Sequence, residues 1–67
     1  REKKQVIADA VAALPEKEKQ VVTMYYYEKL KYSEIAKVMG ITQSRVCQIH
    51  SKAMLTLKNK LESYINS

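Results

Sequence analysis

The chain has 67 residues, which is enough for one small domain and too few for two. Its single cysteine, Cys47, excludes an internal disulfide and a zinc site built from cysteine pairs. Twelve Lys and Arg residues against seven Asp and Glu residues give a net charge of +5, which favours a polyanionic partner, above all nucleic acid. No apolar run approaches the roughly 18 residues that span a bilayer, and no signal-peptide pattern is present. We therefore expect an intracellular protein with no membrane partner.

The first part of the chain predicts two amphipathic helices. Residues 3–14 place five apolar side chains on one helical face, namely Val6, Ile7, Ala10, Val11 and Leu14. Pro15 ends that helix, and it can also open the next one at its first position. The second helix is expected to continue to about Glu28, with Val21, Val22 and Tyr25 on one face.

Three consecutive tyrosines, Tyr25 to Tyr27, end this second helix. Successive helical side chains point in different directions, so we expect at least one ring to be partly exposed. The favoured interpretation is that two rings pack and the third covers the seam to the next helix, because tyrosine often buries its ring and keeps its hydroxyl in water. The alternative is an exposed tyrosine that contacts a phosphate or a protein.

Residues 33–58 have the pattern of a helix-turn-helix. Ser33 is a suitable N-cap for a third helix that ends before Gly40, the only glycine, which can adopt a positive φ without steric cost. Thr42 is a suitable N-cap for a fourth helix, which can run from Gln43 nearly to Tyr64 because neither Gly nor Pro interrupts it. The apolar residues that converge on the seam are Ile35, Ala36, Met39, Ile41, Val46 and Ile49. The alternative is a plain helical bundle whose turn happens to contain glycine.

The fourth helix has an apolar face and a polar one. At about 100° per residue, its inward face holds Val46, Ile49, His50, Ala53, Leu57, Leu61 and Tyr64. Short and amide side chains lie at the exposed N-terminal end, where they can approach base edges: Gln43, Ser44, Cys47 and Gln48. Three further residues are candidates for phosphates, namely Thr42, Arg45 and Lys52. The alternative for each residue is a solvated surface side chain.

Other residues carry weaker signals. His50 has no neighbouring ligand or catalytic partner, so we expect a structural role. Leu55 projects away from the core face and is a candidate contact for a protein partner. No paired carboxylates, no nucleophile with its base and no phosphate-binding loop are present, so we expect neither an enzyme nor a bound cofactor, metal or small-molecule substrate. The sequence predicts one all-α domain over residues 1–67, with four helices and a C-terminal helix-turn-helix at about 33–58.

The run from Leu14 to Lys58 resembles region 4, the C-terminal domain, of bacterial sigma-70-family RNA polymerase sigma factors. The residues that carry the resemblance are Leu14, Pro15, Lys17, Glu18, Glu34, Ile35, Ala36, Gly40, Ser44, Arg45, Val46, Gln48, Ile49, Ala53 and Leu57. The segments YYYEKL and SRVCQIHSKA look most like the alternative motility or flagellar type. The resemblance covers about two-thirds of the chain.

The resemblance implies that the domain binds the −35 element of double-stranded promoter DNA and docks on the flap of the polymerase β subunit. In several members of the family an anti-sigma factor holds this domain. By position, the candidate residues named above keep their roles, with Gln43, Ser44, Cys47 and Gln48 on bases and Thr42, Arg45 and Lys52 on phosphates. Housekeeping members commonly carry charged residues where this chain has Gln43, Ser44 and Cys47, so we expect a different, A/T-rich element.

The sequence leaves two other functions open. One is a protein-interaction domain, held by an anti-sigma factor or by the polymerase flap, with little DNA binding of its own. The other is the effector domain of a response regulator or another repressor, although recognition helices in that class usually differ after the turn. As a sigma-factor domain, the protein is expected in the bacterial cytoplasm.

Overall fold

The computed structural model describes residues 3–66, without the side chains of residues 3, 64 and 66. These residues form α1 (Lys3–Ala12), α2 (Glu16–Val22), a π-helical turn η1 (Thr23–Tyr27), α3 (Tyr32–Met39) and α4 (Gln43–Asn66). No strand occurs within residues 3–66. The predicted all-α fold with four helices is therefore confirmed.

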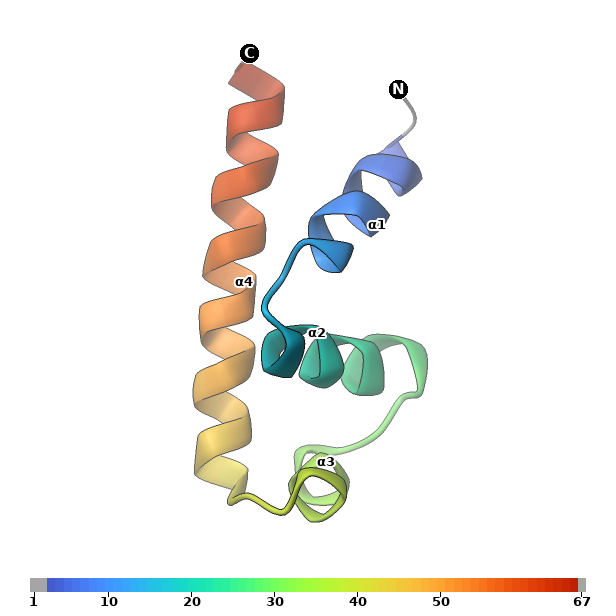
Figure 1. The fold of residues 1–67 in the computed structure, drawn as a ribbon, viewed down its shortest axis with the longest axis vertical. Helices are drawn as coiled ribbons and strands as arrows, with labels where there is room; N and C mark the ends of the chain where they lie inside the picture. Colours follow the sequence, from blue (N-terminus) through green and yellow to red (C-terminus); the bar gives the residue numbers. More distant parts are fainter. Residues whose placement is uncertain (1–2, 67) are drawn as a thin grey trace.

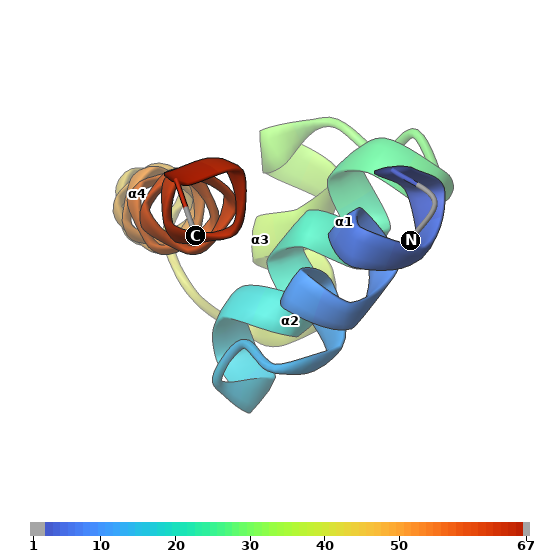
Figure 2. The ribbon, with the colours of Figure 1, turned by 90° about the horizontal axis from the view of Figure 1, so that it is seen from above.

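Helix α4 sets the length of the molecule. Its 24 residues span about 36 Å at 1.5 Å per residue, against a longest extent of 39 Å for the whole structure. The other three helices lie along one side of α4, with α3 near its N-terminal end and α1 near its C-terminal half (Figure 1). Seen from above, α4 stands on its own opposite the other three helices (Figure 2). Much of its surface therefore faces solvent.

One core cluster joins α2, α3 and the N-terminal half of α4. Its buried residues are Val21, Ile35, Ala36, Val46 and Ile49. Five partly buried side chains pack against them, namely Met24, Leu30, Tyr32, Met39 and Ile41. The seam residues predicted from the sequence thus meet here, and burying each large apolar side chain contributes about 1.5–3 kcal/mol.

A second core cluster joins the end of α1, α2 and the middle of α4. Leu14, Val22 and Ala53 are buried in it, and Val11, Met54 and Leu57 pack around them. This cluster holds α4 beyond the helix-turn-helix. Leu61, also predicted on this face, is half-buried, whereas Tyr64 lies outside the described side chains.

Helix α1 differs from its prediction at two points. It ends at Ala12, two residues before Leu14, and Pro15 has ψ 151°, so it is the N-cap of α2 and not its first residue. Ile7 is 46% exposed although it was expected on the buried face. The physical reason is that only the C-terminal end of α1, through Val11, and Leu14 in the segment that follows it pack into the second core cluster, so Ile7 has little to cover it.

The second helix does not continue as an α-helix to Glu28. After Val22 the backbone widens into the π-helical turn, whose end is marked by the Glu28 N–H donating to the Thr23 carbonyl oxygen at 3.1 Å. Lys29 then adopts φ 60°, the left-handed conformation that ends helices. A π-turn inserts one extra residue per turn, which changes where the tyrosines point.

Helix α3 begins two residues earlier than an N-cap at Ser33 predicts. The Glu34 carboxylate accepts a hydrogen bond from the Lys31 backbone N–H at 2.8 Å. Lys31 is therefore the N-cap and Tyr32 the first helical residue, so the expected N-cap at Ser33 is wrong. Three residues separate this donor and acceptor, which is the spacing of the glutamate half of a capping box.

Candidate nucleic-acid interface

The turn between α3 and α4 is built by Gly40. It has φ 69° and ψ 34°, and the backbone N–H of Ile41 donates to the Ala36 carbonyl oxygen at 3.0 Å. A Cβ at position 40 would meet nothing within 4 Å, so the demand for glycine comes from the left-handed backbone and not from crowding. The turn brings α4 across the end of α3, as a helix-turn-helix requires (Figure 1).

Thr42 caps α4 as predicted. Its Oγ1 accepts the Arg45 backbone N–H at 3.1 Å, and its carbonyl oxygen accepts the Val46 N–H at 3.1 Å. Side-chain capping satisfies one of the free donors in the first turn. The hydroxyl hydrogen of Thr42 is not used in this bond and can still be donated to another group.

The N-terminal half of α4 presents a continuous polar surface. Seven exposed residues form it, and we call them the α4 surface: Gln43, Ser44, Arg45, Cys47, Gln48, Ser51 and Lys52. Of the three residues between them, Val46 and Ile49 are buried in the first core cluster and His50 is half-buried. All base and phosphate candidates on the helix thus lie on one accessible side, and Thr42 lies exposed at its start. Their contacts with DNA stay predictions.

A groove of about 330 Å³ runs between the start of α2 and the α4 surface. Its lining residues are Pro15, Glu16, Lys17, Glu18, Arg45, Gln48, Ile49 and Lys52. The exposed Lys17 is thereby added to the cations beside Gln48, a role that the sequence reasoning missed. The only signal in the sequence was that Lys17 belongs to the motif at the start of the second helix. Because Lys17 is far from Arg45 and Lys52 along the chain, the sequence did not show that the three side chains line one groove.

Glu18 is one of the residues that line this groove and is 6% exposed. Its Oε1 is buried and has no hydrogen-bond partner. Burying a carboxylate without a partner is costly, because the charge loses its hydration. On the α4 side of the groove, Arg45 Nη1 donates to Gln48 Oε1 at 3.3 Å.

His50 lies in a tyrosine cluster on another side of α4. Tyr26 Oη is 2.9 Å from Nε2 of the imidazole, and the Tyr32 hydroxyl bonds Nδ1. The Tyr25 ring lies 5.1 Å from the imidazole centroid. Burial lowers the pKa of His50 below its usual value of 6.5. His50 thus joins α4 to η1 and α3, in agreement with the structural role expected of it.

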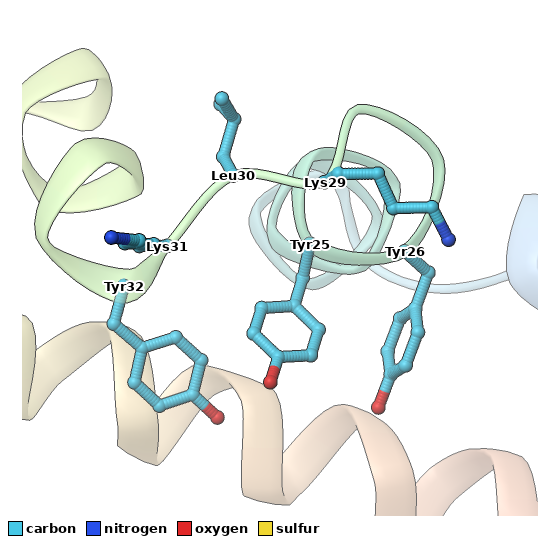
Figure 3. A pocket seen from close by; sticks show the side chains of 6 residues that line it. All are labelled: Tyr25, Tyr26, Lys29, Leu30, Lys31 and Tyr32. Atoms are coloured by element: carbon cyan, nitrogen blue, oxygen red, sulfur yellow. The ribbon is translucent and has the colours of Figure 1, made fainter.

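The tyrosines are more exposed than expected. Tyr27 is 66% exposed and has no ring contact among the described residues, so it does not cover a seam. Tyr25 and Tyr26 pack edge to face at 4.8 Å, and with Tyr32 they direct their hydroxyls toward α4 (Figure 3). Burial, followed by the nearby Cys47, raises the pKa of Tyr32 above 10. These rings therefore position α4, and they also line a cavity of about 580 Å³ beside Lys29 and Lys31.

The rest of the described structure offers few other sites. Leu55 is 59% exposed, as expected of a side chain that projects away from the core. No group of three metal-ligating side chains occurs in the described part of the chain. Among the helices of residues 3–66, none combines the length and the apolar character needed to cross a membrane.

Comparison with known proteins agrees with this geometry. Residues 10–59 match the family model described as Sigma-70, region 4. RNA polymerase sigma factor FliA of Pseudomonas aeruginosa is 43% identical over 58 residues, which are 87% of this chain and 24% of that protein. RNA polymerase sigma-D factor of Bacillus subtilis is 46% identical over 59 residues, 88% of this chain and 23% of that protein.

FliA of Escherichia coli K12 is 45% identical over 58 residues, which are 87% of this chain and 24% of that protein. The chain thus spans about a quarter of the length of the curated relatives it matches. The family model covers most of the chain, including α2, the turn and the α4 surface. With its helix-turn-helix and these matches, the chain belongs to the sigma-70 region 4 family.

Proposed function

We propose that this domain binds the −35 element of promoter DNA as part of a sigma factor that directs RNA polymerase to start transcription. The observation that carries the proposal is the α4 surface. It combines short and amide side chains at the free end of a helix with flanking cations, and the helix is held across α3 by the turn. That is the arrangement with which a recognition helix enters the major groove.

The α4 surface divides into two chemical roles. Gln48 and Gln43 carry amides that can pair with adenine through one donor and one acceptor. Ser44 and Cys47 are short, so they contact a thymine methyl or allow close approach of the helix. Arg45 and Lys52 neutralise phosphates, and Thr42 offers its hydroxyl or the nearby backbone N–H groups to another phosphate. Lys17, which lines the same groove from the α2 side, is a further proposed phosphate contact.

The proposed partners besides DNA are proteins. The relatives are named as sigma factors of RNA polymerase, so we propose that the core enzyme, through the flap of its β subunit, binds this domain. An anti-sigma factor is the second partner. Leu55, exposed on α4 beyond the DNA surface, is a contact for one of these two proteins. A factor with this role works in the bacterial cytoplasm.

The isolated domain binds DNA weakly on this account. Only three cations border the groove, so few phosphates are neutralised and affinity falls as salt rises. Attachment to polymerase raises the effective concentration of the domain at the promoter, which compensates for the weak contact.

The test is a binding selection on a library of DNA duplexes with a randomised core. The 67-residue chain and the full-length factor bound to RNA polymerase core are each incubated with the library at low salt, and the bound duplexes are sequenced. We expect the polymerase complex to enrich an A/T-rich element. A complex that binds the library but enriches no base at any position would contradict the proposal, and binding to polymerase without DNA selection would support a protein-interaction domain instead.

A further inference from the structure

The buried carboxylate of Glu18 is the least satisfied polar group among the described residues. It is 6% exposed, and its Oε1 is the one buried side-chain oxygen or nitrogen there with no hydrogen-bond partner. An orphaned buried charge is destabilising unless a partner arrives with the right geometry. Glu18 faces the groove between α2 and the α4 surface, so such a partner can come from α4.

The second observation is a hydrogen bond between two residues of the α4 surface that line the same groove. Arg45 Nη1 donates to Gln48 Oε1 at 3.3 Å. A glutamine that reads adenine needs that oxygen as the acceptor for the adenine N6 amino group, while its amide N–H donates to N7. In this structure one of the two lone pairs of Gln48 Oε1 accepts a hydrogen bond from a side chain of its own helix, which holds the amide beside Arg45.

We propose that Glu18 is a second partner for Arg45, and that Arg45 changes partner from Gln48 to Glu18 when the domain binds DNA. In the bound state the Arg45 guanidinium leaves Gln48, pairs with the Glu18 carboxylate and keeps a free edge for a phosphate. Gln48 is then released to pair with its base. Glu18 is thus a positioning residue for base recognition that never touches DNA, and the inference rests on the proposed function.

Arg45 suits this exchange better than the two lysines that line the groove. Its guanidinium has five donors in a planar fork, so it can bond a carboxylate and a phosphate at once, whereas an ammonium acts as a compact point charge. Arg45 is also the cation that is hydrogen-bonded to Gln48. Lys17 and Lys52 are exposed in the groove and stay available for other phosphates.

The test uses Glu18→Gln, with Glu16→Gln as its matched control. Both changes remove one negative charge from the same groove, but Glu16 is exposed and pairs with Lys19 at 3.5 Å. The full-length factor bound to polymerase core is incubated with the random-core duplex library, and base preference and total binding are measured for each variant. Thermal melting of the DNA-free 67-residue chain is recorded in parallel.

We expect Glu18→Gln to lower the preference for one base at one position about fivefold, the value of one ordinary hydrogen bond. Total binding to the library should not fall, because the variant is less negative, and the melting temperature should stay equal or rise, because the orphaned charge is gone. Glu16→Gln should leave the preference unchanged. In an Arg45→Met background, adding Glu18→Gln should change the preference no further.

Three results would overturn the inference. One is a Glu18→Gln profile identical to that of the wild type. Another is a loss of binding to every sequence together with a lower melting temperature, which would make Glu18 a purely structural residue. The third is a wild-type complex that enriches no base, which would remove the proposed function as well; the first two results leave that function standing.

Discussion

Arg45 and Gln48 are bonded to each other on the exposed side of α4, Nη1 to Oε1 at 3.3 Å. One side chain carries a positive charge and the other an amide, and they are one helical turn apart. The side chains proposed for the phosphate contact and for the base contact are therefore in contact with each other. For substitutions at either residue, total binding and base preference have to be measured separately.

The small number of cations around the groove predicts that the DNA affinity of the chain depends only weakly on salt concentration. If Lys17, Arg45 and Lys52 each neutralise one phosphate, the slope of log K against log salt concentration is about −2.7 for the 67-residue chain. Lys17→Ala should reduce the magnitude of that slope by about 1. Lys60→Ala is the control, because Lys60 is exposed on the C-terminal half of α4. Equal slopes for Lys17→Ala and the wild type would remove Lys17 from the interface.

The lowered pKa of His50 predicts that the fold loses stability in mildly acidic solution. Its folded pKa is lowered by burial, so the fold favours the neutral imidazole. The contribution is therefore complete above the unfolded pKa of about 6.5 and is lost as pH falls through the lowered folded value. Urea unfolding at a series of pH values measures it. His50→Gln should flatten the curve between pH 7 and 5, and an unchanged curve in that variant would show that His50 does not cause the slope.

Gly40 predicts a stability difference between two substitutions. Gly40→Ala places a Cβ on a left-handed residue and should cost about 1 kcal/mol of unfolding free energy. Gly40→Asn should cost less, because asparagine enters this region more readily. Since a Cβ at position 40 would meet no atom within 4 Å apart from its chain neighbours, the cost of Gly40→Ala comes from the backbone conformation and not from crowding. Chemical denaturation of the three chains is the measurement, and equal stability of all three would contradict the turn geometry.

Leu55 predicts an effect on protein binding without an effect on folding. Leu55→Asp changes a side chain that is 59% exposed, so the unfolding free energy should move by less than about 0.5 kcal/mol. Binding to RNA polymerase core or to an anti-sigma protein should weaken, as scored by pull-down from a bacterial lysate. Lys60→Asp, about 140° further round the helix, is the matched control. If Leu55→Asp leaves every protein interaction unchanged, Leu55 is not a partner contact.

Helix α4 was predictable because its signals are local. The length of α4 follows from the absence of Gly and Pro after Thr42. The side that it buries follows from the spacing of the apolar residues Val46, Ile49 and Ala53. The same periodicity places Gln48 on the opposite side. The family resemblance rests on this stretch and on the motif at Leu14, and the match over residues 10–59 confirms it.

Features that depend on tertiary contacts or on competing local bonds were missed. The start of α3 was misplaced because the Glu34 carboxylate captures the Lys31 N–H, which makes Ser33 an ordinary helical residue. The π-helical turn after Val22 has no simple sequence signature. Glu18 and Arg45 line the same groove although they are 27 positions apart in the chain, so only the packing of α2 against α4 reveals it.

The α4 surface is proposed to read DNA with separate base and phosphate residues. The most direct measurement compares Gln48→Ala with Arg45→Ala in full-length factor bound to polymerase, on the random-core duplex library. We predict that Gln48→Ala relaxes preference at one position by about 1–3 kcal/mol, whereas Arg45→Ala weakens binding to all sequences. Equal losses on every sequence for both variants, or no loss for either, would contradict the account.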